Sequence, residues 1–207
     1  MAVKTAGIEV PGTLLRTLSA GANVEQSLRV AAVLFVAALT AAAAQVSVPL
    51  PFTPVPFTLQ PMVVLLGGAA LGSRLGMASQ VLYLLIGITG APVFAWSPVL
   101  PQGVLRLLGP TGGYLMSYPL AAFVAGALAE RGFDRRYLTS VCAMAAGLAA
   151  IFACGVIWLA WFARPAGAGL ELALSTGLYP FLPADLIKVA VAAAVMPAIW
   201  KFVPPSR

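Results

Sequence analysis

The sequence predicts an all-α integral membrane protein with six transmembrane helices and both termini in the cytoplasm. Of the 207 residues, 61% are hydrophobic and only 9% are charged, whereas soluble globular proteins carry about 25% charged residues. The mean hydropathy is +0.97, and the apolar residues form long segments of the kind that can cross a bilayer as helices. We therefore expect a six-helix membrane domain at residues 29–203, a cytoplasmic N-terminal extension at 1–28 and a cytoplasmic tail at 204–207.

The composition argues against several classes of function. The chain contains no histidine, and its two cysteines, Cys142 and Cys154, fall in one apolar segment. Neither a clustered His/Cys metal site nor a Ser–His or Cys–His catalytic pair is therefore expected. The net charge of +6 comes from basic residues near the segment ends, which indicates membrane topology rather than a nucleic-acid partner. We expect neither an enzyme nor a resident cofactor.

The first span is predicted from about Leu28 to Val48, after an extension with a short surface helix around residues 13–18. It contains two pairs of alanines in small-xxx-small spacing, Ala37/Ala41 and Ala38/Ala42. Small residues allow helices to approach closely in a membrane, where burial of apolar surface gives little drive for association. Alanine is also simply common here, but the two overlapping pairs favour a face on which a partner helix docks.

A proline-rich stretch follows at residues 49–61, with five prolines and the aromatic residues Phe52 and Phe57. Proline at this density cannot continue a helix, and the aromatic content is unusual for a solvated loop. We predict an ordered lid at the membrane surface. A second span at about 59–71, with proline tolerated in its first turn, and a third at about 77–95 come next.

The fourth span is predicted to open at Gly109, after a loop that contains Arg106. Its GPTGG start includes Gly112 and is followed by Tyr114. No Gly-Lys-Ser/Thr follows, so a nucleotide-binding loop is not expected. The glycines instead allow close backbone approach and leave free N–H groups at a helix N-terminus. The fifth span, at about 141–162, ends in an aromatic run that includes Trp158.

The sixth span, at 178–200, carries Asp185 and Lys188 inside its apolar run. A lone charge near the bilayer centre costs roughly 2.5–3.5 kcal/mol on insertion scales, so such residues usually face the protein interior and have partners. The i, i+3 spacing places both side chains on one helical face. The pair could be a salt bridge that only joins helices, but an apolar filler would do the same. We therefore favour a ligand site.

The basic residues fix the predicted orientation. If the N-terminus is cytoplasmic, six spans place nine of the 12 Lys and Arg residues on the inner side, only Arg106 and Arg164 on the outer side, and Lys188 in the membrane. Positive charge is concentrated in the cytoplasmic loops of membrane proteins. The lid, the loop with Arg106, Trp158 and the Asp185–Lys188 pair then lie in the outer half, which predicts a ligand pocket open to the outside.

Several sequence blocks resemble the BioY family: PLPFTPVPFTLQ at 49–60, GAPVF at 90–94, LLGPTGGYL at 107–115, YPLAAF at 118–123 and PADLIK at 183–188. The similarity extends over about residues 30–200 in the family's order, and the first and third blocks are specific to it. BioY proteins are the biotin-binding S-components of energy-coupling-factor (ECF) transporters. The resemblance therefore implies a multi-pass protein of a prokaryotic plasma membrane that captures biotin from outside as a transported ligand.

The resemblance also implies partners and site residues. The partners would be an ECF transmembrane subunit and two ATPase subunits, with the alanine pairs of the first span as the docking motif. Asp185 and Lys188 match family positions at the biotin site. Some relatives carry an Arg after the Tyr of GPTGGY, where this chain has Leu115, and Arg106 is the candidate replacement. Gln102 is the candidate for an Asn that some relatives place in the preceding loop.

The chemistry of biotin suits these residues. Its ureido ring offers two N–H donors and a carbonyl acceptor, and its tail ends in a carboxylate. Asp185 can accept from a ureido N–H, while Lys188 can donate to the carbonyl or meet the tail, in charge-assisted hydrogen bonds. Tyr114 and Trp158 are candidates to cover the apolar bicycle, although Trp158 fits an interfacial belt equally well.

Two other classes of function are alternatives to a binding subunit. A self-sufficient secondary transporter could use Asp185 as a proton site, but such proteins often contain internal repeats, and residues 30–110 and 111–200 show no convincing one. An intramembrane enzyme would need a nucleophile–base pair, which the sequence lacks. Since the sequence has no Walker motif either, any ATP-derived energy must come from another chain.

Overall fold

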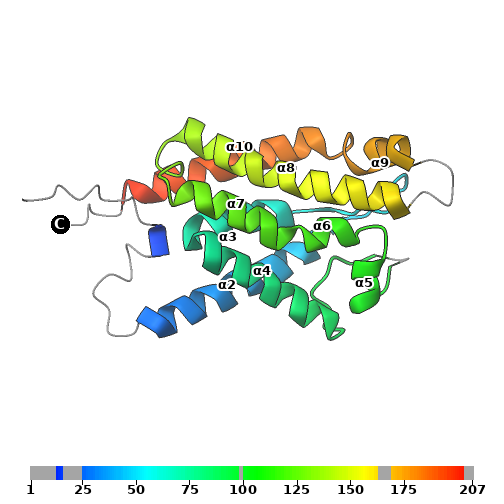
Figure 1. Cartoon of the computed structure of the whole chain (residues 1–207), viewed down its shortest axis with the longest axis horizontal. Coiled ribbons are helices and arrows are strands. Elements are labelled where there is room, and N and C mark those ends of the chain that lie inside the picture. Colours follow the sequence, from blue (N-terminus) through cyan, green and yellow to red (C-terminus); the bar gives the residue numbers. More distant parts are fainter. Residues whose placement is uncertain (1–12, 16–24, 98–99, 163–168, 203–207) are drawn as a thin grey trace, which may run out of the picture.

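The computed structural model describes residues 13–15, 25–97, 100–162 and 169–202 as a helical bundle with one small β-hairpin (Figure 1). Most of the predicted N-terminal extension and all of the predicted tail lie outside these residues, as does Arg164. Residues 14 and 15 of the predicted surface helix are helical. The helices are α2 (Glu25–Gln45), α3 (Gln60–Leu71), α4 (Ser73–Ile88), α5 (Val104–Leu108), α6 (Gly112–Met116), α7 (Tyr118–Ala129), α8 (Tyr137–Phe162), α9 (Gly169–Gly177) and α10 (Leu182–Trp200).

The long helices run back and forth between two ends of the bundle (Figure 1). The start of α2, the α3–α4 junction, the α7–α8 loop and the end of α10 lie at one end, on the left of the figure, which we call the terminal end. The opposite end carries α5 and α9 and is called the lid end. The beginning of α2 and the end of α10 therefore lie on the same side of the bundle.

Within the described ranges, four segments are long and apolar enough to span a bilayer: Gln26–Gln45, Gly112–Ala129, Tyr137–Phe162 and Leu182–Trp200. Helices α3 and α4 are apolar but shorter, with 12 and 16 residues. The chain is thus a mostly helical, multi-pass membrane protein, in agreement with the class predicted from its composition.

The boundaries of the third span differ from the prediction. The gap expected between the second and third spans is reduced to Gly72 alone, whose φ of 90° favours glycine, and α4 begins at Ser73 rather than near residue 77. The carboxylate of Glu130 explains the early start, because it accepts hydrogen bonds from the Ser73 backbone N–H at 2.9 Å and from its hydroxyl at 3.0 Å. A carboxylate at a helix N-terminus is favourable.

Small residues bring α3, α4 and α7 together in the core. A side chain at Gly68 would collide with the backbone of Ala122, and one at Gly126 would collide with the backbone at Gly72 and Ser73. Ala122 and its neighbour on the same face, Ala125, are fully buried. Such close approach supplies the van der Waals packing that holds membrane helices together, and it forms the frame on which the lid end is built.

The proline-rich stretch closes into a hairpin rather than an irregular loop. Strand β1 (Ser47–Val48) pairs antiparallel with β2 (Phe57–Thr58), with Ser47 opposite Thr58. We call residues 47–59 the lid. Its middle is joined to α9, because the Thr53 hydroxyl donates a hydrogen bond of 2.7 Å to the Thr176 carbonyl. The predicted ordered lid is therefore present, and it lies over the start of α10.

Candidate functional site

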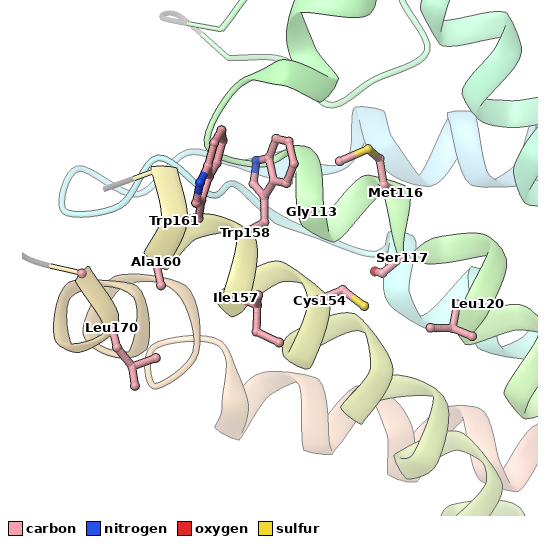
Figure 2. Close-up of a pocket in the computed structure, with 11 residues that line it drawn as sticks. Gly113, Met116, Ser117, Leu120, Cys154, Ile157, Trp158, Ala160, Trp161 and Leu170 are labelled. Carbon is pink, nitrogen blue, oxygen red and sulfur yellow. The ribbon is translucent and has the colours of Figure 1, made fainter. Parts of the chain in front are cut away.

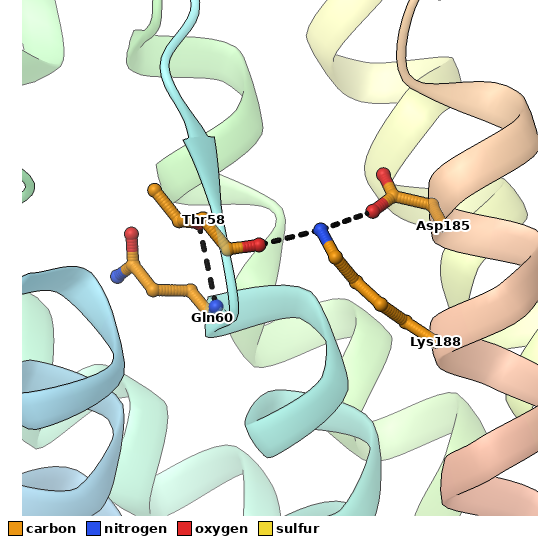
Figure 3. Close-up of polar contacts among 4 residues, drawn as sticks. All are labelled: Thr58, Gln60, Asp185 and Lys188. Atoms are coloured by element: carbon orange, nitrogen blue, oxygen red, sulfur yellow. Dashed lines mark hydrogen bonds and ion pairs between the residues drawn. The ribbon is translucent and has the colours of Figure 1, made fainter. Parts of the chain in front are cut away.

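The two charges of the sixth span face the interior beneath the lid. Asp185 lies in the first turn of α10 and Lys188 lies one turn further on, with 4% and 9% of their surfaces exposed. The Lys188 ammonium donates to Asp185 Oδ1 at 2.6 Å and to the backbone carbonyl of Thr58 in β2, also at 2.6 Å (Figure 3). The pair is thus both internally neutralised and bonded to the lid.

The lid also places an aromatic ring beside the Lys188 ammonium. The Lys188 ammonium lies 3.6 Å from the centre of the Phe57 ring, a distance at which a cation is attracted to the ring face. The Phe57 ring stacks on Phe181, with 6.5 Å between their centroids. The first turn of α10 and the lid strand therefore form one polar–aromatic unit.

A small cavity lies beside this unit. Its volume is about 40 Å³, whereas cavities that hold small molecules typically measure about 300–1,000 Å³. A metabolite could enter only if the lid or the lining side chains moved. The lining comes from the lid, α3, α6, α7, α8, the end of α9, and α10 with the residue before it: Val55, Pro56, Thr58, Pro61, Tyr114, Tyr118, Ile151, Phe152, Gly177, Phe181, Asp185 and Lys188.

Tyr114 is the one further residue of the predicted substrate set in this lining. Its ring occupies space left by Gly155 of α8, where any side chain would collide with it. Its hydroxyl donates a 2.9 Å hydrogen bond to the Gly177 carbonyl at the end of α9. Three predicted residues from two spans, Tyr114, Asp185 and Lys188, therefore share one cavity.

The sequence reasoning missed several lining residues. Tyr118 is buried, lines the cavity and stacks against Tyr83 with 6.4 Å between the rings. Its spacing of four from Tyr114 was the signal that could have identified it, because i and i+4 lie on one helical face. Phe152 and Phe181, which also line the cavity, carried no distinguishing pattern, since aromatic residues occur in most of the apolar segments.

The other three predicted substrate residues lie outside this lining. Gly112 packs against the backbone carbonyl of Leu107, where a side chain would not fit. Trp158 donates a 2.8 Å hydrogen bond from its indole N–H to the Gly109 carbonyl. Both contacts lie at the start of α6 and the loop before it, and neither residue belongs to the cavity lining.

Arg106 holds the loop before α6 instead of reaching the cavity. Only 1% of its surface is exposed, and its guanidinium donates to the carbonyls of Leu100, at 3.0 Å, and of Ala95. Burial lowers the pKa of this guanidinium. Gln102, the candidate stand-in for a family Asn, donates to the Phe94 carbonyl at 3.3 Å in the same loop. Both side chains are engaged with backbone carbonyls of the loop.

A larger groove of about 790 Å³ is lined by other residues of α6, α7, α8 and α9. Trp158 and Trp161 stand at one end of it, with Cys154, Ile157 and Leu120 along its length (Figure 2). Among the described residues that line it, none carries a charge. The described lining therefore offers no charged group to pair with the carboxylate of a ligand such as biotin.

The structure separates the two predicted alanine pairs on α2. Ala37 is 3% exposed and belongs to the bundle core, against which Ala41 also packs. Ala38 and Ala42 are exposed on the outer surface of the bundle. Only the Ala38/Ala42 pair therefore has a free face that a helix of another chain could approach.

Comparisons with known proteins agree with this architecture. The sequence model of the BioY family matches residues 16–205. The chain is 41% identical over 165 residues to the probable biotin transporter BioY of Pyrococcus horikoshii, covering 78% of this chain and 89% of the relative. It is 40% identical over 161 residues to the biotin transporter BioY of Thermotoga maritima, covering 76% and 87%.

The fold is similar to a solved structure described as the S-component for biotin from an ECF-type ABC transporter. The TM-score is 0.76 with 24% sequence identity, and the match covers 86% of this chain and 94% of that one. At this identity the likeness concerns the fold.

Proposed function

Because the chain belongs to the BioY family, we propose that it is the biotin-binding subunit of a vitamin uptake transporter and captures biotin at the outer face of the membrane. The observation that carries this proposal is the buried Asp185–Lys188 pair, which lies beside a cavity at the lid end. A transport subunit has no catalytic step of its own, so we assign no enzymatic activity.

The lining suits the two chemical halves of biotin. Asp185 can accept a hydrogen bond from a ureido N–H, and Lys188 can donate to the ureido carbonyl or to the tail carboxylate, which are charge-assisted contacts. Tyr114, Tyr118 and Phe181 supply apolar walls for the bicycle. This arrangement of a few polar groups among aromatic side chains is typical of small-molecule sites.

The direct test is to purify the chain in detergent from cells grown with biotin and to identify the small molecule that co-purifies. We expect biotin in about a one-to-one ratio, and calorimetry on the stripped protein should show that biotin binds and that an unrelated vitamin of similar size does not. The absence of both co-purified and rebound biotin, in a monodisperse sample, would contradict the proposed function.

We further propose that the subunit works with an ECF transmembrane subunit and two ATPase subunits. The chain has no Walker motif, so ATP hydrolysis must be carried out by partners. The exposed Ala38/Ala42 face of α2 is the proposed docking surface, because small residues let a partner helix approach the backbone closely.

The proposed topology has six spans, formed by α2, α3, α4, α6 with α7, α8 and α10, in a prokaryotic plasma membrane. The described basic residues support cytoplasmic termini. Lys201 and most of the arginines stand in the segments at the terminal end, whereas Arg106 is at the lid end (Figure 1). This asymmetry follows the positive-inside rule. Residues 1–28 and 204–207 would then be cytoplasmic, and 29–203 would form the membrane domain.

Cysteine labelling of intact cells tests this orientation. In a Cys142→Ala/Cys154→Ala background, Ser175→Cys in α9 should react with a membrane-impermeant maleimide, because it is exposed at the lid end. Arg136→Cys, which is exposed at the terminal end, should react only after permeabilisation. The reverse pattern would place the lid in the cytoplasm and contradict capture of biotin from outside.

A further inference from the structure

The Lys188 ammonium is surrounded by three described groups. It donates to Asp185 Oδ1 and to the Thr58 carbonyl, each at 2.6 Å, and it lies 3.6 Å from the centre of the Phe57 ring. An ammonium group has three N–H donors and no acceptor. Its contacts with the protein therefore engage it on three sides.

Two of these three groups belong to the lid strand β2. The carbonyl of Thr58 and the ring of Phe57 come from adjacent residues, and the strand is held in place by its pairing with β1. The third group, Asp185, stands on the same helix as the lysine. Any movement that lifts β2 away from α10 leaves Lys188 with only its intrahelical partner.

We infer that Phe57 and Thr58 are positioning residues of the substrate site, which hold the Lys188 ammonium through its charge. Their two contacts with Lys188, which we call the latch, keep the lid closed. A ligand oxygen that bonds to Lys188 has to displace one of its three partners. Asp185 stands one turn away on the same helix, so the group displaced in our proposal is one of the two lid groups, and ligand binding and release of the latch are the same exchange. This inference rests on the proposed biotin site for the identity of the ligand, whereas the latch itself is a property of the chain alone.

The latch differs from the hydrogen bond that joins the lid to α9. Thr53 joins the middle of the lid to the Thr176 carbonyl of α9 through a neutral hydrogen bond of 2.7 Å. That tie does not involve Lys188 and is not expected to respond to a ligand at Asp185 and Lys188. The phenylalanine at the exposed part of the lid, Phe52, has 58% of its surface exposed and serves as the matched control for Phe57.

Lid opening can be measured without any ligand. A cysteine at position 55, introduced as Val55→Cys in the Cys142→Ala/Cys154→Ala background, replaces a side chain that lines the cavity and is 9% exposed. Its rate of reaction with a soluble maleimide reports how often the lid opens. We expect Phe57→Leu, which keeps an apolar side chain but removes the ring face, to accelerate labelling about fivefold, as loss of a partly buried cation–π contact would. Phe52→Leu should leave the rate unchanged.

Faster labelling in Phe57→Leu could also come from lost packing, since Phe57 stacks on Phe181. Removing the charge of Lys188 distinguishes the two explanations. We therefore repeat Phe57→Leu in an Asp185→Leu/Lys188→Met background, where the stacking partner remains and the charge is gone. If Phe57 acts through the ammonium, its replacement should no longer change the labelling rate. Equal acceleration in the two backgrounds, or equal acceleration by Phe52→Leu, would overturn the latch.

The effect of biotin on the labelling rate provides a second test. With the wild-type pair, saturating biotin would fill the cavity that Val55 lines. It should therefore shield Val55→Cys and slow its labelling even though the latch is released, and Phe57→Leu should raise both the association and the dissociation rate of biotin. A change in the dissociation rate alone would mean that Phe57 is only a ligand contact, contrary to the latch. If biotin neither binds nor slows labelling, the proposed function fails, while the ligand-free labelling rates still decide whether the latch exists.

Discussion

Replacing Asp185 and Lys188 together, as Asp185→Leu/Lys188→Met, is expected to abolish measurable biotin binding while the bundle stays folded. A buried ion pair can often be exchanged for apolar residues of similar volume at little or no cost in stability. The ligand, in contrast, loses hydrogen bonds to charged groups that contribute about 1.5–3 kcal/mol each. Two such losses correspond to a weakening of about 10²–10⁴-fold.

The single replacements are less informative about the site, because each leaves a buried group unpaired. Asp185→Asn leaves Lys188 charged beside a neutral amide, and Lys188→Met leaves a buried carboxylate, so both should lower thermal stability as well as affinity. Ile187→Ala, on the exposed face of the same helix turn, controls for changes in α10. Calorimetry that finds near wild-type affinity in a monodisperse double variant would refute the assignment of the pair to the site.

Replacing Ala38 by Trp is expected to abolish uptake that depends on the energising partners while biotin binding to the isolated subunit stays nearly unchanged. Ala38 is exposed on α2, so the indole does not disturb the bundle. It does separate two helices whose backbones must meet at small residues. The measurement compares biotin uptake by cells that express all subunits with biotin binding by the purified subunit.

Two further alanines provide the controls. Ala149 is exposed on α8, across the bundle from α2 (Figure 1), and Ala149→Trp should leave both uptake and binding unchanged. Ala37 is 3% exposed, and Ala37→Trp should impair folding and binding together because it overpacks the core. If Ala38→Trp lowers binding in step with uptake, the docking face is wrong.

The helical membrane class of the protein and the charged pair of the candidate site were predictable from the sequence. The apolar segments led to the multi-pass helical protein, and the family resemblance, carried by the proline-rich and GPTGG blocks, is confirmed by the match over residues 16–205. Asp185 and Lys188 stood out because charges inside an apolar span are costly and need partners. The structure shows their contact at 2.6 Å.

The helix boundaries were harder to predict than the helices themselves. The third span begins at Ser73 because Glu130, which is 57 residues away in the sequence, caps it. The fourth consists of two helices, α6 and α7, which meet at Ser117. The first feature depends on a contact that no local pattern in the sequence reports, whereas the break at Ser117 lies beside Pro119 in the first turn of α7, where proline is tolerated.

The sequence by itself determined that this chain is a membrane protein, where its apolar segments lie and which two charges are buried among them. Only the tertiary structure decided which side of each helix faces inward. Ala37 is in the core while its neighbour Ala38 is exposed, and Phe57 contacts Lys188 while Trp158 bonds to the Gly109 carbonyl and does not line the cavity. The physical reason is that lipid tails are as apolar as a protein core. Inward and outward faces therefore use the same residues, and only the packing of the helices distinguishes them.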